Sequence, residues 1–155
     1  MKEVEKYLPH RDPFLFIDDF SVVDATHYAG TFSFDPGHPI FQGHFPGFPV
    51  VPGVLLIECM AQCGGAGVIK AGGISTNQTI LLASVASAKF RRMVRPGDAI
   101  SFEVETIKVS HRMLRQRGRA IVDGSVAAEA EWVCMVGGAG ETASKQGAQP
   151  CRTNA

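Results

Sequence analysis

The sequence predicts an α+β fold in which an antiparallel β-sheet wraps around one long buried helix. The stretch from residue 53 to 70 has the length of a helix and is apolar on nearly all sides, as expected for a buried one. Strand-like segments lie on both sides of it, two before and four after. The 155 residues, 45% of them hydrophobic, suffice for one domain with a sizeable core. We assign this domain to residues 1–136 and expect residues 137–155, which are poor in apolar side chains, to be a disordered tail.

The part before the helix is expected to contain two strands and a long loop. A short helical turn is predicted over residues 3–7, ended by Pro9. Aromatic and β-branched residues predict strands over 14–23 and 27–34, which can pair with each other. Residues 35–52 contain five prolines, a density that excludes both helix and central strand. A loop of this length with interleaved aromatic residues is typical of a packed functional segment.

The helix and the strands after it have clear boundary signals. Pro52 and Gly53 suit the first helical turn, and Gly72-Gly73 suit the end of the helix near residue 70. Later strands are expected over residues 80–90, 99–110, 113–122 and 125–136. Asp123-Gly124, between the last two, is a strong hairpin signal.

Charge, cysteine use and the N-terminus exclude several classes of protein. The formal net charge is zero, so no overall field attracts nucleic acid or an anionic membrane. The N-terminus is charged and lacks the apolar region of a signal peptide, and Glu58 argues against a transmembrane helix. We therefore expect a cytoplasmic protein with reduced thiols. Cys59 and Cys63 lack a second pair of ligands at zinc spacing, so no metal site is expected.

The loop and the start of the helix bring reactive groups to one place. The first N–H groups of a helix lack intrahelical acceptors, so those of Gly53 or Val54 can polarise a thioester carbonyl. His44, in the rigid loop, is a candidate base for the carbon beside that carbonyl. Glu58, an isolated acid in an apolar helix, can hold a hydroxyl on the next carbon and help it leave as water. Gln62, four residues on, shares the face of Glu58 and can orient it.

Each of these residues also has a purely structural interpretation. A lone loop histidine such as His44 is more often a structural hydrogen-bonding group, and Glu58 can face water at the edge of a helix. Their combination, on a rigid loop beside a helix entrance, favours the functional interpretation.

Several motifs in the chain form a pattern typical of one enzyme family. The central ones are Gly43-His44-Phe45-Pro46-Gly47, Pro52-Gly53-Val54-Leu55 and Glu58-Cys59-Met60-Ala61-Gln62. Others are Leu8-Pro9-His10-Arg11-Asp12-Pro13-Phe14-Leu15, Phe90-Arg91-Arg92, Arg95-Pro96-Gly97-Asp98 and Val122-Asp123-Gly124. Over roughly residues 7–136 the chain resembles the (3R)-hydroxyacyl-acyl-carrier-protein dehydratases of the FabZ type. The resemblance implies the hot-dog fold, an antiparallel sheet wrapped around a central helix.

The resemblance also implies a reaction and roles for particular residues. A hydro-lyase of this family reversibly removes water from a 3-hydroxyacyl thioester to give the trans-2-enoyl product in fatty-acid or related biosynthesis. His44 would be the catalytic histidine, Glu58 the catalytic acid, Gly53 the N–H donor to the thioester carbonyl, and Gln62 the residue that orients the acid. No metal or redox cofactor is implied. The implied assembly is a homodimer whose two catalytic residues come from different protomers, often arranged as a trimer of dimers.

Two further assignments concern the acyl chain and its carrier. Phe14, Phe48 and Leu82 are expected to line an apolar tunnel for the acyl chain. The cluster Lys89, Arg91, Arg92 and Arg95 is interpreted as a docking site for an acidic acyl carrier protein and its phosphopantetheine phosphate. The alternative for this cluster is a solvated strand edge.

The chain departs from the family pattern at a few positions. His38 stands where an acid is usual, and we expect it to be a solvated loop residue. Residues 80–82 are aliphatic where a gating Tyr is common, and residues 84–90 lack the usual acidic pair. Acyl chain length and pathway therefore stay open. Glu rather than Asp at position 58 disfavours an additional isomerase activity.

Two other functions remain as alternatives. One is a hot-dog thioesterase, which does not need both His44 and Glu58. The other is a non-catalytic acyl-binding partner subunit, against which the retention of both residues argues. His10, His27 and His111 have no predicted partner and are taken as structural.

Overall fold

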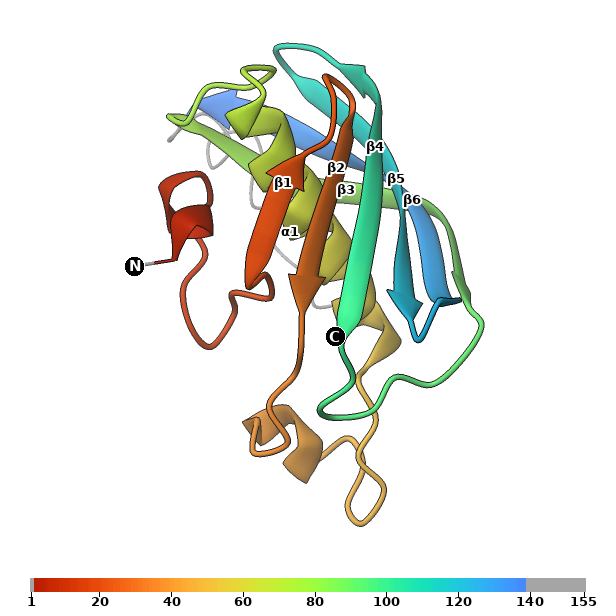
Figure 1. Cartoon of the computed structure of the whole chain (residues 1–155). Coiled ribbons are helices and arrows are strands. Elements are labelled where there is room, and N and C mark those ends of the chain that lie inside the picture. The colour runs from red at the N-terminus through yellow and green to blue at the C-terminus, as the bar shows by residue number, and fades with distance from the viewer. Residues whose placement is uncertain (1, 139–155) are drawn as a thin grey trace, which may run out of the picture.

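The computed structural model describes residues 2–138, which form one helix-and-sheet domain (Figure 1). Its elements are η1 (Glu3–Lys6), β1 (Asp19–Val22), β2 (His27–Phe32), η2 (Pro39–Gln42), α1 (Gly53–Lys70), β3 (Gln78–Phe90), β4 (Ile100–Val109), β5 (Met113–Val122) and β6 (Ser125–Gly138). The short elements η1 and η2 are 3-10 helices.

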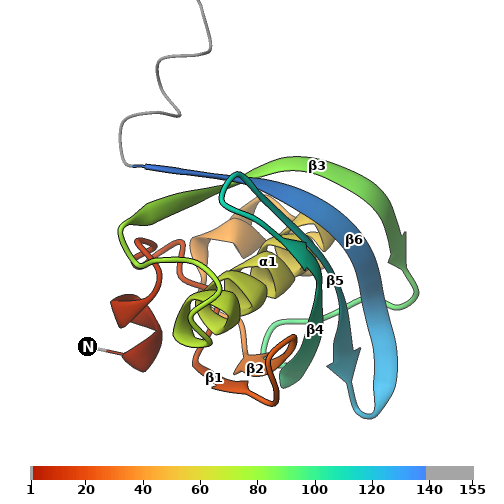
Figure 2. The same cartoon turned by 90° about the horizontal axis from the view of Figure 1, so that it is seen from above.

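The six strands form one antiparallel sheet in the order β1-β2-β4-β5-β6-β3. Seen from above, this sheet curves around α1, so that the helix lies against its inner face (Figure 2). Strands β4 and β5 alternate buried and exposed residues, because side chains on one face meet the helix and those on the other meet solvent. The predicted α+β fold, a sheet wrapped around a central helix, is confirmed.

Helix α1 is buried because its small residues let the sheet approach closely. A side chain at Gly67 would meet the Tyr28 ring, whose Cγ would lie 2.3 Å from the added Cβ. Gly64 is likewise pressed against Gln116, whose Nε2 donates to the Gly64 carbonyl at 3.0 Å. By length and composition α1 could cross a membrane, but 67% of the relevant window is buried inside the domain. It is therefore the core helix of this fold.

The segment before β1 corrects the predicted strand boundaries. Pairing begins at Asp19 rather than at residue 14, and β2 ends at Phe32 rather than at residue 34. The earlier residues are held by a side chain instead of by a strand. The Phe16 N–H donates to Oε1 of Gln62 at 2.8 Å, and Nε2 of Gln62 donates to the Phe14 carbonyl at 3.0 Å.

The remaining boundaries lie close to the predicted ones. The proline-rich loop contains η2, so the expectation that this loop excludes any helix was wrong for four residues. Residues 137 and 138 are part of β6, two residues beyond the predicted end of the last strand. The rest of the predicted tail, residues 139–155, lies outside the described residues. The hairpin at Asp123-Gly124 has positive φ at both residues, 51° and 73°, as its sequence predicts.

Candidate active site

Helix α1 positions Glu58 on the side that faces the N-terminal segment and β3. Gln62, one turn later, donates from Nε2 to Oε1 of Glu58 at 3.0 Å. Gln62 is almost completely buried, and its other two hydrogen bonds fix it to the backbone of the N-terminal segment. Because the amide is held at three points, it places the Glu58 carboxyl in one orientation. The hydrogen bond expected between Gln62 and Glu58 is present.

A second polar group meets Glu58 that the sequence analysis did not identify. Nε2 of His10 lies 3.5 Å from Oε1 of Glu58, and the two side chains are 28% and 22% exposed. The His10 ring stacks on Phe14, with centroids 6.4 Å apart. His10 belongs to the N-terminal motif, yet it is 48 positions from Glu58 in the chain, so no local spacing pointed to this contact.

The pKa of Glu58 reflects opposing influences. Burial raises it, whereas the nearby His10 side chain, the hydrogen bond from Gln62 and the charge that His10 has when protonated all lower it. The net effect is a pKa below the ordinary value, so the carboxyl is ionised at neutral pH when no ligand is present.

A small cavity opens beside Glu58. Its volume is about 190 Å³, and it is lined by His10, Glu58 and Gln62 together with Leu8, Ala61, Gly65, Ile80, Leu81, Leu82 and Cys134. The lining is mostly aliphatic, with its polar groups gathered at one place, as in many small-molecule sites. Leu82, one of the residues expected to line an acyl tunnel, is among the residues that line this cavity. Burial, followed by the Glu58 charge, raises the pKa of the Cys134 thiol to about 12, so this neighbour is neutral.

His44 lies in the loop between η2 and α1, and this loop leads into the N-terminal end of the helix (Figure 1). Its Nδ1 is 2.7 Å from the Val50 carbonyl oxygen, and the Val50 N–H donates to the His44 carbonyl at 3.0 Å. A carbonyl oxygen can only accept, so this contact requires a proton on Nδ1. In the neutral ring, Nε2 then has the free lone pair that a base needs. Within residues 2–138 no hydrogen bond or ion pair joins His44 to Glu58, and His44 does not line the small cavity.

The first residues of α1 have backbone N–H groups without an acceptor, as expected for the start of a helix. Pro52 is the N-cap and Gly53 the first helical residue, while Val54 is 69% exposed. Neither Gly53 nor Val54 donates its N–H to another group in the described part of the chain. The Phe90 ring covers Gly53, and a Cβ added there would be 2.7 Å from Cε1 of Phe90. A side chain at this position would require the Phe90 ring to move.

Three residues, Phe14, Phe48 and His38, have surroundings that differ from those predicted. Phe14 and Phe48 are half exposed and do not line the small cavity. His38 is only partly exposed rather than solvated, because it caps η2: its Nδ1 accepts from the Ile40 N–H at 3.3 Å. Its ring also packs within 6.4 Å of Phe34 and Phe41, measured between centroids.

The basic cluster lies at the end of β3 and in the loop that follows. Arg91 forms an ion pair with Glu129 at 2.8 Å, and Arg92 donates to the Val122 carbonyl at 3.0 Å. The Arg95 guanidinium lies 5.8 Å from the centre of the Phe48 ring. Lys89 is exposed. Arg91 and Arg92 thus already have carboxylate partners, Glu129 and Asp123, which leaves less free charge than the sequence predicts.

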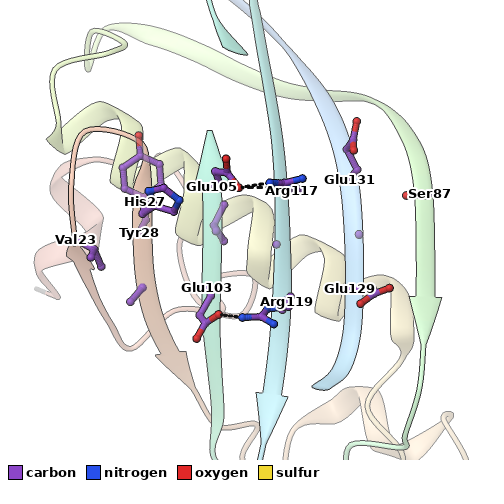
Figure 3. Close-up of a pocket in the computed structure, with 14 residues that line it drawn as sticks. Val23, His27, Tyr28, Ser87, Glu103, Glu105, Arg117, Arg119, Glu129 and Glu131 are labelled. Atoms are coloured by element: carbon purple, nitrogen blue, oxygen red, sulfur yellow. Dashed lines mark hydrogen bonds and ion pairs between the residues drawn. The ribbon is translucent and has the colours of Figure 1, made fainter. Parts of the chain in front are cut away.

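A larger depression, of about 730 Å³, lies on the outer face of the sheet. Its sides are formed by charged residues of β4, β5 and β6, and opposite charges face each other across neighbouring strands (Figure 3). Glu105 pairs with Arg117 at 2.8 Å, and Glu103 pairs with Arg119. Neither His44 nor Glu58 lines it. In the described residues there is also no group of three or more side chains arranged to hold a metal ion.

The fold and these motifs define a class. Residues 8–131 match the FabA-like domain family, and the chain belongs to that family. The resemblance to FabZ-type enzymes is also confirmed. The 3-hydroxyacyl-[acyl-carrier-protein] dehydratase FabZ of Sodalis glossinidius is 42% identical over 138 residues, which cover 86% of this chain and 90% of the relative. That of Pelotomaculum thermopropionicum is 41% identical over 137 residues, covering 88% and 97%.

Solved structures share the hot-dog fold at low sequence identity. The dehydratase heterocomplex ApeI:P of Xenorhabdus doucetiae matches with a TM-score of 0.76 and 16% identity, over 90% of this chain and 94% of that one. A hypothetical thioesterase of Streptococcus pneumoniae, solved with coenzyme A, matches with a TM-score of 0.56 and 13% identity, over 79% and 88%. At such identities the likeness shows the fold alone.

Proposed function

We propose that the protein is a hydro-lyase that removes water from 3-hydroxyacyl-acyl-carrier-protein to give the trans-2-enoyl thioester in fatty-acid biosynthesis. The observation that supports this most directly is the Glu58 carboxyl. It is held by Gln62 and lines a mostly aliphatic cavity, within a chain that is 37% to 42% identical to several FabZ relatives over most of its length. No redox step is involved, because the reaction only moves a hydroxide and a proton.

The chemistry can be written with the residues at hand. Nε2 of His44 takes a proton from the carbon beside the thioester carbonyl, and the N–H of Gly53 stabilises the negative charge on the carbonyl oxygen. The C–O bond to the hydroxyl breaks, and protonated Glu58 gives its proton so that water leaves. Ligand binding favours the protonated form of Glu58 that this step needs. Filling the cavity excludes water, and burial is the influence that raises the pKa of Glu58.

The active unit we propose is a homodimer in which His44 of one protomer acts with Glu58 of its partner. Strand β3 supports this, because it is an edge strand 13 residues long that pairs only with β6 in the described sheet. It is exposed from Leu81 to Phe90, and Leu81, Leu82 and Val85 are between 41% and 48% exposed. A long apolar edge is a template for pairing with another strand. Such a dimer can form a trimer of dimers.

We further propose that the acyl chain arrives on the phosphopantetheine of an acyl carrier protein in the cytoplasm. Lys89 and Arg95 are the members of the basic cluster that form no ion pair with a carboxylate side chain among residues 2–138. They are the side chains of this cluster best suited to meet an acidic carrier or its phosphate.

The test is the appearance of enoyl-thioester absorbance when the purified protein meets a 3-hydroxyacyl carrier-protein thioester. We expect His44→Ala and Glu58→Gln each to lower the rate by about 10²–10⁴-fold, the usual contribution of a general acid or base. Thermal unfolding and sedimentation of both variants show whether fold and dimer are intact. Release of free thiol in place of enoyl product would instead establish the thioesterase. An inactive wild type with short and long chains would favour the acyl-binding subunit.

A further inference from the structure

His10 and Gln62 approach the same oxygen of Glu58. Nε2 of Gln62 and Nε2 of His10 lie 3.0 Å and 3.5 Å from Oε1. Within the described chain, Oε2 receives no hydrogen bond, although Glu58 lines the cavity. One carboxylate oxygen is therefore used for anchoring, and the other is left for a ligand.

The surroundings of the ring indicate which of its nitrogens has the proton. Nδ1 is buried and has no partner in the part of the chain that the structure describes. A buried N–H without an acceptor is more costly than an unused acceptor, so Nδ1 is best left unprotonated. Nε2 then has the proton and points it at Glu58. The Phe14 ring, stacked on His10, keeps the imidazole in this plane.

We propose that His10 is a positioning residue for Glu58: with Gln62 it fixes Oε1, so that Oε2 faces the substrate hydroxyl. The inference rests on the proposed dehydration. The 3.5 Å separation is longer than a formed hydrogen bond, and such contacts in ligand-free sites tighten when substrate binds. His10 does not touch the reacting atoms and acts through Glu58.

The other groups around this pair do not offer the same control. Cys59 of α1 and Cys134 of β6 are thiols whose pKa is raised, so they are neutral. Strand β3 contributes only the aliphatic Ile80, Leu81 and Leu82 to the cavity. The Arg11 guanidinium donates to the carbonyls of Leu8 and His10, at 2.8 Å and 2.6 Å. His10 is thus the titratable neighbour that acts on the Glu58 carboxyl.

The experiment compares His10→Phe, which keeps the stacked ring but removes the donor, with His10→Gln, which restores an N–H donor. We expect His10→Phe to lower kcat by about 10–100-fold, the scale for a misplaced catalytic group, with KM within about twofold. His10→Gln should recover most of this loss. His27→Phe is the matched control, because it removes the other histidine–carboxylate contact found among residues 2–138, in which His27 lies 2.9 Å from Asp24.

A second readout needs no activity. Because His10 lowers the pKa of Glu58 and burial raises it, the ¹³C NMR titration midpoint of the Glu58 carboxyl should move up in His10→Phe. It should not move in His27→Phe. The basic limb of the kcat profile should move up with it, since dehydration needs protonated Glu58. An unchanged midpoint and an unchanged kcat in a folded His10→Phe protein would overturn the proposal. An inactive wild type with a shifted midpoint would count against the dehydratase alone.

Discussion

The two hollows of this domain differ in size and in how their charges are satisfied. The outer depression is about 730 Å³, and its carboxylates face arginines across the strands. The inner cavity is about 190 Å³ and contains one carboxylate, Glu58, held by neutral or weakly basic donors. The large hollow is a neutralised exposed sheet surface, whereas the small one has a carboxylate with a free oxygen.

In this domain, a carboxylate with an oxygen free of hydrogen bonds marks the candidate site better than the volume of a hollow does. An ion pair at the surface leaves little free energy for a ligand, because both charges already have partners. A partly buried carboxylate that is held by an amide and an imidazole, with one oxygen left free, is the kind of group that proteins keep where it is used.

The largest expected effect is at Gln62, which anchors the inner site. Gln62→Leu roughly keeps the size of the side chain but removes its amide. The buried Phe16 N–H then has no acceptor, and Glu58 loses the hydrogen bond donated by Gln62. We expect the free energy of unfolding to fall by about 2–4 kcal/mol, from a lost bond and an orphaned buried donor. Urea unfolding measures it.

Glu103→Gln is the control on the outer face. It removes one exposed ion pair, with Arg119, and should cost less than about 1 kcal/mol. Equal losses in the two variants would mean that the inner site is no more tightly held than the outer one.

The next prediction compares Gly67, on the side of α1 that packs against the sheet, with Gly65, on the side that lines the cavity. Gly67→Ala would place a Cβ 2.3 Å from Cγ of Tyr28, near the ring's attachment, where the side chain has little freedom to yield. It should destabilise the fold by about 1–3 kcal/mol. Gly65→Ala meets Leu8 at 3.5 Å and Ile80 at 3.9 Å, which are ordinary contacts.

Gly65→Ala should therefore keep stability or raise it by up to about 1 kcal/mol, because alanine favours the helix. It also reduces the cavity beside Glu58, so KM for longer acyl chains should rise relative to short ones. Calorimetry and a chain-length series give the two readouts. A destabilised Gly65→Ala would show that no open space exists there.

The fold was predictable because its signals are local. The apolar pattern of residues 53–70, the Asp123-Gly124 turn and the later strands are each decided within a few residues. The boundary of β1 was not predictable, because a side chain from α1, Gln62, takes the place of a strand partner for the backbone around Phe16. Such a substitution depends on tertiary contact and leaves no periodicity in the sequence.

The site was predictable in part for the same reason. Glu58 and Gln62 are one helical turn apart, so their contact follows from spacing. His10 and Glu58 meet only because the N-terminal segment packs on α1. The residues around His10 in the sequence do not indicate which residue it contacts. The roles of His44 and Gly53 stay predictions, since the sequence places them near the helix start but not opposite a substrate.

A smaller effect concerns the pH dependence of stability. The folded-state pKa of Glu58 lies below its ordinary value of 4.5, so its stabilising contribution is present above that pH and is lost as pH falls through the lowered value. Glu58→Gln lacks this contribution. The unfolding free energy of the wild type should therefore fall more steeply below pH 4.5 than that of Glu58→Gln. Urea unfolding at a series of pH values tests it, and parallel curves would contradict the lowered pKa.

The smallest effect belongs to the outer depression. Glu105 and Arg117 are direct cross-strand neighbours paired at 2.8 Å, yet their side chains are 33% and 60% exposed. A double-mutant cycle with Glu105→Gln and Arg117→Gln should give a coupling of only about 0.2–1 kcal/mol in urea. The coupling should shrink further in high salt, because solvent screens exposed charges. A coupling above about 2 kcal/mol would exceed the range of exposed pairs. The outer hollow would then be a desolvated, organised site, and charge satisfaction would no longer distinguish it from the cavity at Glu58.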